Sequence, residues 1–71
     1  MALEDHVGDV IAKARKGLGI KPENVAVAAG LSAENYALFE EEGMRDEVPD
    51  FDKIGALLGL ASDKLATIAA G

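Results

Sequence analysis

The sequence contains no cysteine, and histidine occurs only once, at position 6. Without thiols the chain can form no disulfide bond, no thiolate zinc site and no cysteine nucleophile. One histidine near the chain start cannot complete a Ser-His-acid triad, and no glycine-rich loop ending in Lys-Ser or Lys-Thr is present to hold a phosphate. We therefore expect the isolated domain to have no enzymatic activity, no metal site and no cofactor. A catalytic domain elsewhere in a longer chain is left open.

Long hydrophobic runs are also absent, and the sequence begins with acidic rather than basic residues, Met1-Ala2-Leu3-Glu4-Asp5. These features argue against a membrane span and a signal peptide, so we expect a cytoplasmic protein with no membrane partner. His6 follows the same acidic stretch, and we expect it to belong to a solvated chain end. Acidic side chains outnumber basic ones by 13 to 7, which gives a formal net charge of -6. This charge disfavours binding to DNA phosphates or anionic lipids.

What the sequence does contain is apolar residues at helical spacing. A chain of 71 residues, 49% of them hydrophobic, suffices for a single domain, residues 1–71, with one small core. The first helix is predicted from about Leu3 to Leu18 by an apolar stripe of Val7, Val10, Ile11, Ala14 and Leu18. A second, short helix is predicted from Pro22 to Ala29, because proline is tolerated in a first turn and Gly30 can end a helix.

The second half of the chain predicts three more helices. Ser32 is a favoured N-cap for a third helix that ends near Glu41 or Gly43, with Tyr36 and Phe39 facing inward. An acidic loop is expected over residues 41–50. Phe51 then opens a fourth helix that stops at Gly59, and Ser62-Asp63 caps a last turn or two. No segment alternates with the period of a strand, so the expected fold class is all-α, a compact five-helix bundle.

Two of these predicted helices are separated only by Ala29-Gly30-Leu31-Ser32, the spacing of a helix-turn-helix over about residues 22–41. From Val10 to Leu65 the chain resembles, without gaps, the XRE (Cro and phage-repressor) family of helix-turn-helix domains. The residues that carry the resemblance are Ile11-x-x-Ala14-Arg15, Gly19-Ile20, Val25-Ala26, Ala29-Gly30-Leu31-Ser32, Tyr36-x-x-Phe39-Glu40, Val48, Phe51, Ile54, Leu57-Leu58-Gly59-Leu60 and Leu65. The resemblance implies a lambda-repressor-like DNA-binding fold with a structural ion pair between Arg15 and Glu40.

The first hypothesis for function is therefore a DNA-binding domain of a transcriptional regulator, acting on double-stranded DNA and most often as a homodimer. The resemblance places Ser32, Ala33 and Asn35 at the start of the recognition helix, where Ser32 and Asn35 are suited to read base edges or phosphates. The basic residues around the end of the first helix would contact the phosphate backbone; they are Lys13, Lys16 and Lys21.

The rival hypothesis is a non-DNA-binding accessory or protein-interaction domain with the same fold, as the N-terminal part of a longer regulator or metallo-hydrolase. Pro22 stands where the family usually has a glutamine that contacts DNA, and it offers no donor. Glu34 and Glu41 lie on the face that would approach the phosphates, and the acidic loop follows. Both features fit a protein partner better than DNA.

Overall fold

The computed structural model describes residues 6–44 and 47–70, and in this part of the chain the only regular secondary structure is helical, with no strand. The expectation of an all-α fold with five helices is confirmed. The helices are α1 (Val7–Gly17), α2 (Pro22–Ala29), α3 (Ala33–Glu42), α4 (Phe51–Leu58) and α5 (Ser62–Ala70). None of the helices in the described part of the chain has both the length and the apolar character needed to cross a membrane.

Side chains fix where three of the helices begin. Ser32 Oγ accepts the backbone N–H of Asn35 at 3.1 Å, and Asp50 Oδ1 accepts that of Lys53 at 3.1 Å. His6 does the same for α1 through its ring nitrogen. Each bond satisfies a backbone donor that the first helical turn leaves without a partner. Because His6 has extended backbone angles, α1 begins at Val7 and not near Leu3 as predicted; residues 3–5 lie outside the described part.

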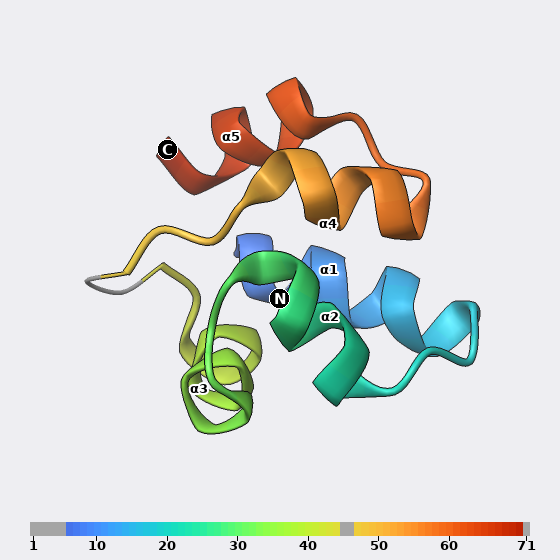
Figure 1. Ribbon diagram of the computed structural model, residues 1–71. Coiled ribbons are helices and arrows are strands. Elements are labelled where there is room, and N and C mark those ends of the chain that lie inside the picture. The colour runs from blue at the N-terminus through green and yellow to red at the C-terminus, as the bar shows by residue number, and fades with distance from the viewer. Residues whose placement is uncertain (1–5, 45–46, 71) are drawn as a thin grey trace, which may run out of the picture.

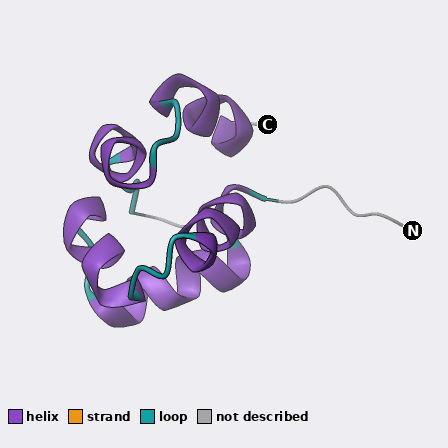
Figure 2. Ribbon diagram, turned by 90° about the vertical axis from the view of Figure 1, so that its right-hand side faces the viewer, coloured by secondary structure: helices purple, strands orange, loops and turns teal. Residues whose placement is uncertain are grey.

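The five helices form two groups, visible in two perpendicular views (Figures 1 and 2). α4 and α5 lie together on one side of the molecule, above α1, α2 and α3 in Figure 1. α3 packs against both α1 and α2, while α2 also packs against α4. This arrangement leaves the outer side of α3 facing away from the rest of the bundle.

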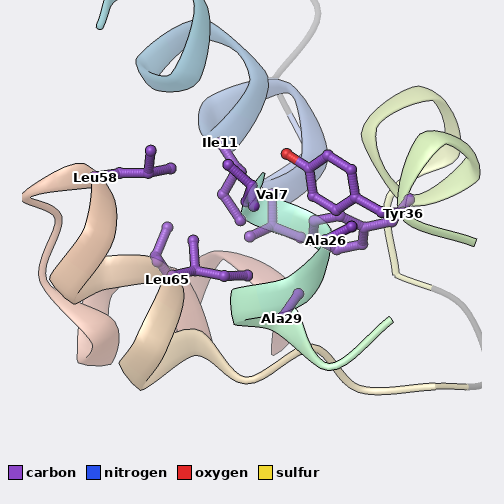
Figure 3. Close-up of a cluster of buried hydrophobic side chains, with 10 residues drawn as sticks. Val7, Ile11, Ala26, Ala29, Tyr36, Leu58 and Leu65 are labelled. Atoms are coloured by element: carbon purple, nitrogen blue, oxygen red, sulfur yellow. The ribbon is translucent and has the colours of Figure 1, made fainter. Parts of the chain in front are cut away.

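A single hydrophobic core lies between the two groups (Figure 3). Side chains from all five helices enter it, and the fully buried ones include Ile11, Val25, Tyr36, Ile54 and Leu65. The Tyr36 and Phe39 rings pack at a centroid distance of 6.1 Å. Burial of these apolar surfaces is the main force that holds such short helices, which would be marginal in isolation.

The acidic loop expected over residues 41–50 is shorter than predicted. Glu41 and Glu42 belong to the last turn of α3, which ends at Gly43 with a φ of 86°. Glutamate has a high helix propensity, so the run of acids prolongs the helix until a glycine takes a backbone conformation that other residues avoid. The last helix is longer than the turn or two expected, since α5 continues to Ala70.

Candidate functional site

The segment between α2 and α3 sets the direction in which α3 leaves the core. Gly30, with a φ of 75°, ends α2, and the backbone N–H of Leu31 donates to the carbonyl of Ala26 at 3.0 Å. Ser32 then caps α3 within two residues. Because Tyr36 and Phe39 point into the core, the opposite side of α3 is left to solvent. We call this side the α3 outer face; it consists of Ala33, Glu34, Asn35, Ala37 and Glu41, all exposed.

A charged network fixes the other end of α3 against α1. Arg15 Nε donates to Glu40 Oε2 at 2.6 Å, and Arg15 Nη2 donates to Glu40 Oε1 at 3.1 Å. Arg15 Nη1 also donates to the carbonyl of Ile20 at 3.0 Å, and the Tyr36 hydroxyl donates to Glu40 Oε2. The pair that the family resemblance links is thus a bidentate contact, and it joins α1, α3 and the segment that leads into α2.

The electrostatics of this network keep each group in its usual charge state. Burial opposes ionisation of Glu40, but hydrogen bonds from Arg15 and Tyr36 outweigh it and lower the pKa of the carboxyl. Burial, together with the adjacent Glu40 carboxylate, raises the pKa of Tyr36. The hydrogen bond to Glu40 likewise raises the pKa of Arg15. At neutral pH the pair is ionised and the phenol is neutral, which suits a structural role rather than proton transfer.

The residues predicted to read DNA bases lie at the start of α3, where Ser32 and Asn35 each make a hydrogen bond within the protein. Ser32 Oγ accepts the backbone N–H of Asn35 as the helix cap. Asn35 Nδ2 donates to Glu47 Oε1 at 2.7 Å, a contact with the connection between α3 and α4. Ala33 is exposed and has no polar side chain. One amide N–H of Asn35 is therefore bonded to Glu47, while the amide also carries a second N–H and a carbonyl oxygen.

The residues predicted to contact phosphates are three lysines, two on α1 and one just before α2. Lys13, Lys16 and Lys21 are all exposed. Lys16 lies close enough to Glu40 to add a small electrostatic contribution to that carboxylate, after burial and the hydrogen bonds described above. It therefore lies beside the last turn of α3, roughly 12 Å along the helix axis from Ser32 at 1.5 Å per residue. Lys21 precedes α2 as its N-cap residue and makes no side-chain cap bond.

The α3 outer face is acidic along its length. Glu34 and Glu41 are seven residues apart, close to two helical turns, so they lie on one stripe with Ala37 between them. Glu47 adds a third carboxylate beside Asn35. The sequence predicted the acids on this face, but the pairing of Asn35 with Glu47 spans a loop and has no local signature.

Two residues with a structural part in this region were missed from the sequence. His6 caps α1 and also contacts the end of α3, and Gly8 allows α1 and α3 to approach closely. Within residues 6–44 and 47–70, no group of three or more His, Asp or Glu side chains could hold a metal ion. Comparison with protein-family models, with curated proteins and with solved structures finds none that matches this chain.

Proposed function

We propose that this chain is a protein-interaction domain, built on an XRE-like helix-turn-helix fold, whose α3 outer face binds a basic surface of a protein partner. The observation that supports the proposal is the stripe of Glu34, Ala37 and Glu41 on that face, with Glu47 next to it. In a DNA-reading domain the corresponding side chains approach the phosphate backbone.

Electrostatic interactions distinguish a DNA partner from a protein partner with a basic surface. Carboxylates brought within a Debye length of phosphates, about 8 Å at physiological salt, are repelled. The same carboxylates attract a basic protein surface and speed its association. Ala37 and the half-buried Leu38 lie between the two acids along the helix. Such a module fits an accessory domain of a longer regulator or metallo-hydrolase.

A second candidate is the DNA-binding domain of a transcriptional regulator. It is favoured by the exposure of Ser32 and Ala33 at the start of α3, and by the exposed Lys16 and Lys21. These two lysines could neutralise phosphates, each adding roughly one unit to the salt dependence of binding. Asn35 could read a base with its second amide N–H and its carbonyl oxygen while keeping the bond with Glu47.

Amide-shift titrations of the ¹⁵N-labelled protein test both candidates. The ligands are a mixed-sequence DNA duplex and a short synthetic peptide that alternates lysine with alanine, each at about 20 mM and about 150 mM salt. We expect the peptide to shift the amides of Glu34 to Glu41 at low salt and the duplex to shift none. Salt-sensitive shifts with the duplex at Lys16 to Lys21 and Ser32 to Ala37 would support the DNA candidate instead.

Charge reversal separates the α3 outer face from the overall charge of the domain. The test variant carries Glu34→Lys and Glu41→Lys. The control carries Asp52→Lys and Asp63→Lys, which make the same change in net charge at exposed positions on α4 and α5. We expect the test variant to lose peptide binding and the control to retain most of it. Equal loss in both would contradict a specific role for α3.

A further inference from the structure

His6 joins the start of α1 to the end of α3 through both nitrogens of its ring. Nδ1 accepts the backbone N–H of Asp9 at 3.1 Å, and that N–H also points to the His6 carbonyl oxygen at 3.0 Å. Nε2 lies 3.1 Å from the carbonyl oxygen of Glu41. A nitrogen that accepts a hydrogen bond carries no proton, and a contact with a carbonyl oxygen requires a donor. The geometry therefore assigns a neutral imidazole with its proton on Nε2.

Glycines on both helices make room for this ring. A Cβ at Gly43 would lie 3.1 Å from His6 Cγ, and a Cβ at Gly8 would lie 3.0 Å from His6 Cε1. The ring thus lies between the first turn of α1 and the residue that ends α3, with 35% of the side chain exposed. A change in its position would alter contacts with both helices.

We propose that His6 is a pH-responsive latch between α1 and α3. A second proton can be placed only on Nδ1, where it would face the N–H of Asp9, so two donors would oppose each other and the cap of α1 would be lost. The proton comes from solvent, and no other covalent bond is made or broken. The ring then turns its Nδ1–H away from the helix end, which also takes Nε2 out of reach of the Glu41 carbonyl, and α1 and α3 separate locally.

The charged groups near the ring belong to α1 and α3. On α1, the nearest carboxylate is that of Asp9, with Oδ2 3.7 Å from Nε2. On α3, Glu40, Glu41 and Glu42 form the last turn, and of these Glu40 is held by Arg15. Release of the ring therefore rests on the loss of the Nδ1 contact with Asp9.

Wild-type protein tests the latch by NMR between about pH 8 and about pH 5, the range in which histidine side chains ordinarily change charge. We expect ring ¹⁵N shifts at pH 8 to show the proton on Nε2. On acidification, the amides of Asp9 and Gly43 should move with the ring. Their hydrogen exchange, corrected for its intrinsic pH dependence, should accelerate roughly fivefold in the first turn of α1, the effect expected for a lost helix cap. A proton on Nδ1 at pH 8 would overturn the proposal.

His6→Asn is the matched control, because an asparagine carbonyl can cap the same N–H but cannot take up a proton in this range. We expect the variant to fold and its Asp9 and Gly43 amides to stop following the pH. Any shift that persists comes from the nearby carboxylates. If the variant shows the same acid-induced shifts and exchange as wild type, His6 is not the latch.

Discussion

Arg15 and Glu40, 25 residues apart in the sequence, meet in a bidentate contact with N···O distances of 2.6 and 3.1 Å. Arg15 is almost fully buried, with 9% of its surface exposed. A buried ion pair adds little net stability, because both charges lose their hydration. Its value lies in specifying how α1 and α3 dock.

Replacing one member of the pair should therefore lower the free energy of unfolding by more than the intact pair adds to it. For Arg15→Ala we expect a loss of about 3 kcal/mol in the free energy of unfolding, because Glu40 would keep a charge with too few partners. Lys16→Ala, at the exposed neighbouring position, should change stability by less than about 0.5 kcal/mol. Urea denaturation followed by circular dichroism measures both. A loss of only a few tenths for Arg15→Ala would show that the pair does not stabilise the docking.

Tyr36, the third member of the network, should affect the stability of the protein at alkaline pH. Burial, and next the Glu40 carboxylate, raise the pKa of Tyr36 above its ordinary value. The stability linked to this shift is fully present below about pH 10, where an unfolded tyrosine titrates, and is lost as the pH rises towards the folded-state pKa. Tyr36 is the only tyrosine in the chain, so ultraviolet absorbance of the tyrosinate reports on it alone.

We expect the tyrosinate signal of the native protein to appear together with loss of the helical circular dichroism signal, and well above the pH at which the same protein titrates in guanidinium chloride. The denatured sample is the control for the ordinary tyrosine. Ionisation of Tyr36 near pH 10 with the helical signal intact would mean that its hydroxyl is open to solvent.

Much of the fold could be predicted because its signals are local. The bounds of α2 were predicted correctly from the apolar spacing of Val25, Ala26 and Ala29 and from the flanking Pro22 and Gly30. Ser32 predicted the start of α3 through a bond that spans only three residues. Such features depend on neighbours within one or two helical turns, which a single sequence records directly.

The contacts between distant segments could not be predicted from patterns of this kind. His6 was expected in a solvated chain end, yet it contacts the carbonyl of Glu41, 35 residues away. Asn35 was expected to be available to a base, yet it donates to Glu47. Both contacts depend on where α1 and the α3–α4 connection lie relative to α3. Only the family resemblance suggested a long-range pair, between Arg15 and Glu40.

α1 and α3 approach each other closely at Gly8, and Gly17 in the same helix provides a control position. A Cβ at Gly8 would overlap the carbonyl oxygen of Phe39, a backbone atom, whereas a Cβ at Gly17 would meet nothing within 4 Å. Gly8→Ala should therefore force the helices apart and cost about 1–3 kcal/mol. Gly17→Ala, in the same helix, should stabilise the protein by roughly 0.4–1 kcal/mol through the lower entropy of the unfolded chain. Urea denaturation measures both, and equal effects at the two positions would mean that α1 and α3 are not in contact at Gly8.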